Sequence, residues 1–105
     1  MITMIARMRV PPENAPAYEE LMTHVTEMTL KNEPGVRYYA WAKSAEEPDI
    51  YVVVEVYQDE KVHAAHMASE WVRNSIPVSL SLVEGKFDIK QYVTPGQQPV
   101  ALKHG

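Results

Sequence analysis

The sequence predicts an α+β domain, a ferredoxin-like sandwich in which an antiparallel sheet carries its helices on one face. The first observation is the β-α-β-β-α-β order of segments with alternating or helically spaced apolar residues. The second is that proline, glycine or acidic loops separate these segments. The 105 residues suffice for one modest hydrophobic core, so we expect a single domain over residues 1–94 and a tail over residues 95–105.

The first two elements are a strand and an amphipathic helix. Residues 2–10 alternate between apolar and polar side chains, and a pair of prolines ends this strand. Asn14 is suited to cap the following helix, and Pro16 is tolerated in its first turn. The spacing of the next apolar residues predicts a helix over about residues 15–31, with a buried stripe of Tyr18, Leu21, Met22, Val25, Met28 and Thr29.

The middle of the chain predicts a β-hairpin. Residues 36–43 and 50–57 are the two strands, and the acid-rich segment between them is the loop. Residues 50–57 are almost entirely β-branched or aromatic, so both faces of this strand should be covered. Glu55 interrupts the run and shares its face with Tyr51, Val53 and Tyr57.

A second helix and a last strand complete the domain. Asp59 is suited to cap a helix over about residues 60–75, and a helical wheel gives it the core residues Ala64, Ala65, Met67, Ala68, Trp71 and Val72. On that wheel His66 lies at the margin. Pro77 is expected to open a short helical turn, which Gly85 ends. Residues 86–93 form the last strand, and the tail is expected to be a surface arm or partly disordered.

The outer face of the sheet predicts a homodimer. Val52, Val54 and Val56 point away from the helices and are too apolar to leave in water. A second copy packed sheet against sheet would cover them.

Composition excludes several classes of function. The net charge of −4 disfavours nucleic acid and anionic membranes as partners, and the absence of cysteine excludes disulfides and thiolate chemistry. Neither a signal peptide nor a membrane span is evident, so we expect the cytoplasm. His63, His66 and Glu70 share a helix face, but no further strong ligand accompanies them, so we expect no metal.

Short motifs resemble a known family. Glu33-Pro34-Gly35 followed by Tyr39, then Val54-Glu55-x-Tyr57-x-Asp59 and Ala65-His66-x-x-Ser69, are similar to the antibiotic biosynthesis monooxygenase family. The resemblance extends over about residues 2–93. It implies a dimeric α/β barrel with a pocket between sheet and helices in each subunit, and it implies no metal, flavin or haem cofactor.

The resemblance also implies a range of activities. Members oxygenate quinols and anthrones or isomerise a phosphorylated intermediate, and some relatives degrade haem. The haem-degrading branch carries tryptophan at the position of His66 and asparagine near Arg7 or Met8, so haem degradation is disfavoured.

His66 and Glu55 are the candidate catalytic residues. His66 is suited to act as a general base, because imidazole titrates near neutral pH; the alternative is a structural hydrogen bond. Glu55 is too costly to bury unpaired, so we expect it to orient His66, or alternatively to pair with Arg7 or Arg37.

Aromatic side chains are the candidate substrate-binding residues. Those on the sheet should share the face of Glu55, and one helix residue is added: Tyr39, Trp41, Tyr51, Tyr57 and Trp71. The alternative is that they form only the hydrophobic core.

The function predicted is that of a cofactor-independent monooxygenase acting on a small aromatic or quinol-type substrate. The alternatives are an isomerase of a keto/enol metabolite in the same pocket and a dimer that binds a small ligand without catalysis.

Overall fold

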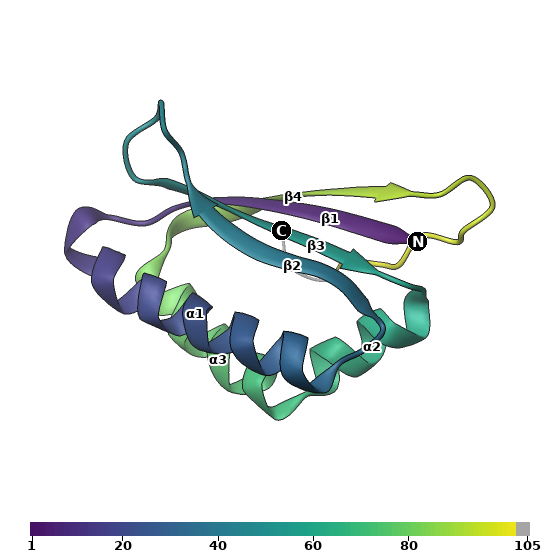
Figure 1. The fold of residues 1–105 in the computed structure, drawn as a ribbon. Coiled ribbons are helices and arrows are strands. Elements are labelled where there is room, and N and C mark those ends of the chain that lie inside the picture. The colour runs from purple at the N-terminus through teal and green to yellow at the C-terminus, as the bar shows by residue number, and fades with distance from the viewer. Residues whose placement is uncertain (103–105) are drawn as a thin grey trace.

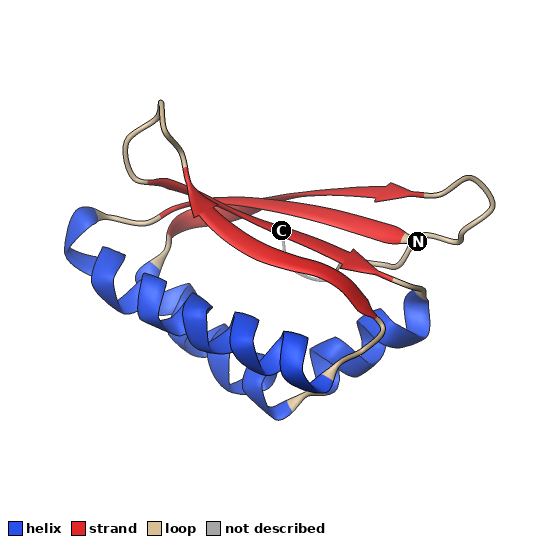
Figure 2. Cartoon of the chain, viewed as in Figure 1, coloured by secondary structure: helices blue, strands red, loops and turns tan. Residues whose placement is uncertain are grey.

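The predicted ferredoxin-like fold is confirmed by a computed structural model that describes residues 1–102. The strands are β1 (Ile2–Arg9), β2 (Val36–Lys43), β3 (Ile50–Tyr57) and β4 (Glu84–Val93). The helices are α1 (Ala15–Asn32), α2 (Glu60–Ala68) and α3 (Glu70–Leu82), with a 3-10 turn at Pro12–Asn14. The sheet has the order β2-β3-β1-β4 and every pairing is antiparallel. All three described helices cover the same face of the sheet (Figures 1 and 2).

The strand register places Glu55 in the middle of the helix-facing side. Glu55 pairs with Met4 of β1 on one side and with Tyr39 of β2 on the other. Met4 and Tyr39 are both buried, as are Tyr51 and Tyr57 on the same face of β3. The expectation that the sheet aromatics share the face of Glu55 is therefore confirmed, because Trp41 pairs with Val53 in the same register.

The prediction of one helix over residues 60–75 is wrong. Asp59 caps α2 as expected, its Oδ1 accepting a hydrogen bond from the Val62 N–H at 3.0 Å. The helix ends at Ala68, because Ser69 has extended backbone angles (φ −65°, ψ 150°) and caps α3 instead. This break turns α2 so that His66 is its buried residue, while Ala64, Ala65 and Ala68 are exposed. The helical wheel failed because it assumed one continuous helix.

The expected roles of Pro77 and Gly85 are also wrong. Pro77 lies inside α3, which continues to Leu82. Gly85 belongs to β4, with a φ of +79° that side chains with a Cβ rarely adopt. The β1–β4 pairing shifts its register nearby, between Arg7 and Arg9. Gly85 therefore allows the irregular backbone at the start of β4, and it does not end a helix.

Asn14 joins the start of α1 to the end of α3. This residue stands at the N-cap position of α1, as predicted, but its side chain makes no capping hydrogen bond. Its Nδ2 instead donates to the carbonyl oxygen of Leu82 at 3.0 Å. The start of α1 is thereby tied to the end of α3, which fixes one end of the space between helices and sheet.

The outer face of the sheet carries an apolar row. Val54 pairs with Ile5 on one side and Ala40 on the other, and all three are half-buried. Val52 and Val56 flank Val54 on this face and are also half-buried. The predicted homodimer would cover this row.

The tail folds back onto the sheet as far as the structure describes it. The side-chain amide of Gln91 in β4 donates to the Val100 carbonyl oxygen and accepts from the Val100 N–H, both at 2.9 Å. Residues 103–105 of the predicted tail lie outside the described residues. Within residues 1–102, no helix is long and apolar enough to cross a bilayer.

Candidate functional site

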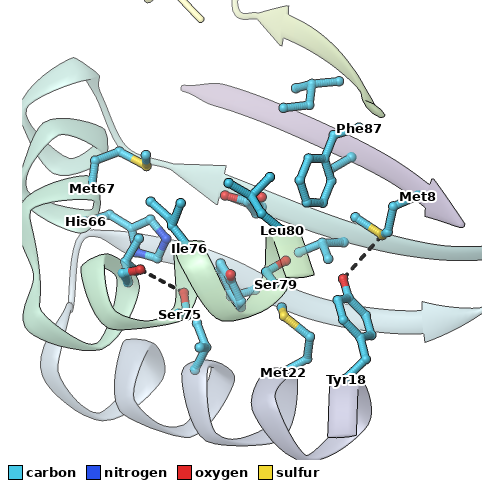
Figure 3. Close-up of a pocket in the computed structure, with 17 residues that line it drawn as sticks. Met8, Tyr18, Met22, His66, Met67, Ser75, Ile76, Ser79, Leu80 and Phe87 are labelled. Atoms are coloured by element: carbon cyan, nitrogen blue, oxygen red, sulfur yellow. Dashed lines mark hydrogen bonds between the residues drawn. The ribbon is translucent and has the colours of Figure 1, made fainter. Parts of the chain in front are cut away.

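A cavity of about 190 Å³ lies between the sheet and the helices. Apolar side chains form most of its wall, and its polar members are Tyr18, Tyr39, Glu55, His66, Ser75 and Ser79. In Figure 3, His66 and Met67 lie at one end, whereas Met8, Tyr18 and Phe87 lie at the other. An engineered apolar cavity of about 150 Å³ holds benzene. A single aromatic ring therefore fits this cavity.

The cavity opens beside α3. Ile76 and Leu80 line it, yet they are 38% and 55% exposed. Several strand residues of the lining, such as Met8 and Val53, are almost fully buried. A ligand would thus enter past α3 and meet the sheet as the floor.

A buried carboxylate–imidazole pair stands at one end of the cavity. The Nδ1 atom of His66 lies 2.9 Å from Oε1 of Glu33 and 3.2 Å from Oε2. The side chains of His66 and Glu33 are only 3% and 10% exposed. Because Nδ1 faces Glu33, Nε2 is the ring nitrogen left for a ligand in the cavity.

Glu33 is itself held by a third side chain. The indole Nε1–H of Trp71, at the start of α3, donates to Oε2 of Glu33 at 2.7 Å. The turn that carries Glu33 also packs closely against α2, because a Cβ on Gly35 would lie 2.4 Å from Cγ2 of Val62. Only glycine allows this approach, which brings the α1–β2 turn within reach of His66.

Burial sets the protonation of His66. It lowers the pKa of the imidazole, and the Glu33 carboxylate opposes this effect without reversing it. A lowered pKa favours the neutral imidazole, which is the form a general base requires.

Glu55 forms a second acid/base pair with Tyr57. The Tyr57 hydroxyl donates to Oε1 of Glu55. Burial raises the pKa of Glu55 to about 7, although the hydrogen bond from Tyr57 acts in the opposite direction. At neutral pH this carboxyl group is close to half-protonated and can either give or take a proton.

The rings of Tyr39 and Tyr57 connect the two pairs. Each ring centroid lies 5.3 Å from that of His66, and Tyr57 also makes an edge contact with His63 at 5.1 Å. Burial, and next the charge of Glu55, raise the pKa of Tyr39 well above its ordinary value. Tyr39 lines the cavity and stays protonated, so its hydroxyl is available as a donor.

Glu55 also borders a second hollow, on the side of α2. This hollow is lined by His63 and Met67 of α2, by Ile89 of β4, and by Ala101 and Leu102 of the tail. The tail is positioned there by the two hydrogen bonds between Gln91 and Val100. Glu55, Met67 and Ile89 line both spaces, so together they form part of the wall between them.

Comparison with known proteins identifies the family. The family model described as Antibiotic biosynthesis monooxygenase matches residues 1–76, which is well over half of the chain and includes Glu33, Glu55 and His66. The chain belongs to the antibiotic biosynthesis monooxygenase family. A search of curated proteins finds no match.

Solved structures share the fold of this family member. A conserved protein from Methanosarcina mazei Go1 is 25% identical, with a TM-score of 0.82 over 87% of this chain and 89% of that chain. A protein from Caulobacter crescentus CB15, named as a candidate antibiotic biosynthesis monooxygenase, is 22% identical, with a TM-score of 0.83 over 87% and 86%. One from Nitrosomonas europaea, named likewise, is 21% identical, with a TM-score of 0.82 over 90% and 98%.

The structure of this monooxygenase-family protein brings only some of the predicted site residues together. His66, Glu55 and Tyr39 line the cavity, and Tyr57 lies directly behind them. The aromatic cluster of Trp41 and Tyr51 is placed elsewhere, since Tyr51 packs on Tyr18 and donates to Glu19. Trp71 bonds to Glu33 and is not among the lining residues.

The expected partners of Glu55 and His66 need correction. The carboxylate bonded to His66 is Glu33, not Glu55. Arg7 and Arg37, the alternative partners of Glu55, bond instead to Glu47 and Gln58. In the sequence, Glu33 stands out only as part of the Glu33-Pro34-Gly35 motif. One feature of the sequence pointed to a role for Glu33 in the site. Its carboxylate comes directly before a turn that leads into the strand of Tyr39, a predicted site residue.

Residues 1–102 contain no group of three or more histidine, cysteine, aspartate or glutamate side chains placed to hold a metal ion.

Proposed function

We propose that this protein is a cofactor-independent monooxygenase that acts on a small phenolic or quinol-type substrate. His66 serves as the general base, Glu55 is a second acid/base group, and Tyr39 is a hydrogen-bond donor. Tyr57 contacts both Glu55 and His66 from outside the cavity lining. Trp41, Tyr51 and Trp71 also lie outside the lining, and they help substrate binding by packing around the residues that form it. The protein works as a homodimer through Val52, Val54 and Val56, in the cytoplasm.

The observation that carries the proposal is the His66 imidazole at the wall of an apolar cavity. Its Nδ1 is engaged by Glu33 and His66 lines the cavity, so Nε2 is the nitrogen left to meet a bound ring. A neutral imidazole beside a phenol can accept the phenolic proton as a general base, because one of its nitrogens carries a lone pair. The small apolar volume is of a size to hold one aromatic ring.

Oxygenation follows from deprotonation of the substrate. A quinol deprotonated by His66 becomes an electron-rich phenolate, which passes an electron to dioxygen. Recombination forms a ring hydroperoxide, and loss of water leaves a hydroxyquinone. One oxygen atom enters the product and the other leaves as water, so the substrate supplies all the electrons. Glu55 is placed to give the proton that assists departure of water.

A second candidate activity is isomerisation, and the pair of acid/base groups favours it. A keto–enol isomerase needs one group that takes a proton and one that returns it. His66 and Glu55 offer both at neutral pH, because Glu55 has a pKa of about 7. The same cavity would then act on an enol without dioxygen.

The test is turnover of a quinol panel with and without oxygen, by wild-type protein and by His66→Ala. We expect oxygen uptake equal to substrate consumed for wild type, and a loss of about 100-fold or more in kcat for the variant. Ser81→Ala is the matched control, because Ser81 is exposed and lies outside the cavity.

Other outcomes separate the alternatives. Turnover without oxygen uptake would identify an isomerase. Binding of the quinols with no turnover would identify a ligand-binding dimer. Equal rates for wild type and His66→Ala would remove His66 from the mechanism.

A further inference from the structure

Both oxygens of Glu33 are engaged, and by different elements. Oε1 meets Nδ1 of His66 in α2 at 2.9 Å, while Oε2 accepts the indole N–H of Trp71 in α3 at 2.7 Å. Oε2 also lies 3.2 Å from the same His66 nitrogen. The carboxylate therefore bridges the two helices on either side of the break at Ser69.

The backbone of Glu33 is also held by hydrogen bonds. Its N–H donates to the Thr29 carbonyl at the end of α1, and its carbonyl accepts from the Val36 N–H at the start of β2. Gly35, two residues on, touches Val62 of α2. Glu33 thus meets His66 from a turn that is held at both ends.

The hydrogen-bond chemistry of the three groups determines which nitrogen of a neutral His66 carries the hydrogen when Glu33 is ionised. An indole nitrogen donates and never accepts, and an ionised carboxylate accepts and never donates. The imidazole nitrogen that faces the carboxylate must therefore carry a hydrogen. In neutral imidazole only one nitrogen does so, which leaves a lone pair on the other.

We propose that Glu33, oriented by Trp71, is a positioning residue that keeps His66 as the Nδ1–H tautomer, with the Nε2 lone pair toward the cavity. This inference deepens the proposed function, since a base needs that lone pair. Neither residue touches the substrate. They determine which nitrogen of His66 accepts the proton.

The tautomer is measured directly by ¹⁵N NMR on protein labelled at histidine. The chain has four histidines, and a His66→Gln spectrum identifies the signals of His66 by their loss. We expect wild-type His66 to show a protonated Nδ1 and an unprotonated Nε2 at pH 7.5. A protonated Nε2 in wild type would overturn the proposal, whether or not any variant folds.

Glu33→Gln is the informative variant because the amide has one acceptor and one donor. Trp71 can only donate, so we expect the amide oxygen to face Trp71 and the amide NH₂ to face His66. Nδ1 must then accept, and His66 switches to the Nε2–H tautomer. A Glu33→Gln protein that keeps the Nδ1–H tautomer would contradict the assigned role of Trp71.

The matched variants test Trp71 separately. Trp71→Phe alone should leave the tautomer unchanged, because the carboxylate still accepts from Nδ1. In the double variant Glu33→Gln/Trp71→Phe the amide is released to turn its oxygen toward His66, and the Nδ1–H tautomer should return. A double variant with the tautomer of Glu33→Gln would contradict the proposal.

Turnover provides the second readout. If the proposed function holds, Glu33→Gln should lower kcat by about 100-fold or more, as expected for loss of a general base, and the double variant should recover part of it. If wild type turns over no quinol, the proposed function fails, but the NMR result still decides the tautomer. The two failures are thus distinguishable.

Discussion

Glu33 and His66 are 33 positions apart in the chain, yet their side chains meet in a buried hydrogen bond of 2.9 Å. One residue ends α1 and the other belongs to α2. The contact depends on the turn between α1 and β2, which packs against α2 through Gly35 and Val62. The Glu33-Pro34-Gly35 motif therefore supplies both a carboxylate and the close approach that places it.

Gly35→Ala should destabilise the protein and disturb His66. The added Cβ would lie 2.4 Å from Cγ2 of Val62, a stiff branched side chain, so the turn or α2 must move. We expect the free energy of unfolding to fall by about 1–3 kcal/mol, measured by denaturant titration.

Val62→Ala provides the control for this clash. Removing both Val62 methyl groups makes room for the new Cβ, so Gly35→Ala should cost much less in a Val62→Ala background. Equal costs in both backgrounds would show that the close approach does not matter.

Stability should fall as pH rises through the titration of Glu55. Its folded pKa, about 7, lies above its ordinary value of 4.5, so the folded protein binds more protons than the unfolded chain between these values. The unfolding free energy therefore decreases from about pH 4.5 to pH 7, by about 3 kcal/mol in total. Glu55→Gln should remove this contribution and leave the opposite one from His66, whose lowered pKa makes stability rise with pH as the unfolded histidine loses its proton.

Denaturant titrations at pH 5 and pH 8, at one protein concentration, measure this effect. Glu20→Gln, which changes an exposed carboxylate on α1, is the control and should keep the wild-type slope. A Glu55→Gln protein with the wild-type pH dependence would mean that Glu55 ionises as readily when folded as when unfolded.

Tyr57→Phe should raise the pKa of Glu55 above its wild-type value. The Tyr57 hydroxyl donates to the carboxylate and stabilises its charged form, while the phenyl ring that packs on His66 is retained in the variant. A ¹³C NMR titration of the Glu55 carboxyl gives the pKa. Tyr92→Phe, at an exposed position, should leave it unchanged, and a lowered value in Tyr57→Phe would reverse the assigned effect of the hydroxyl.

Ser69→Ala should weaken the junction between α2 and α3. The Ser69 hydroxyl donates to the His66 carbonyl at 2.6 Å and accepts from the Val72 N–H at 3.4 Å. Loss of an N-cap costs about 1 kcal/mol. Ser81→Ala removes an exposed hydroxyl near the other end of α3 and should cost less. Equal losses for the two variants would show that Ser69 does not act as a cap.

The strands of the sheet, and which residues share its helix-facing side, could be predicted from the amino-acid sequence. Residues 2–10 alternate between apolar and polar side chains, and residues 50–57 are a β-branched run. Both patterns indicate a strand, and in a strand residues two positions apart share a face, so these assignments need only local sequence. The same period placed Tyr39, Glu55 and Tyr57 on one face, as the pairing of β2 with β3 confirms. The family motifs added the fold and the position of the pocket.

The contacts between side chains in the site depend on the tertiary structure. The helix break at Ser69 changed the face of α2 and buried His66, which a wheel drawn for one continuous helix had placed at the margin. The partner of that imidazole proved to be Glu33 rather than Glu55, with Trp71 behind it. Local periodicity could not reveal these contacts, because they depend on how a turn, two helices and the sheet pack together.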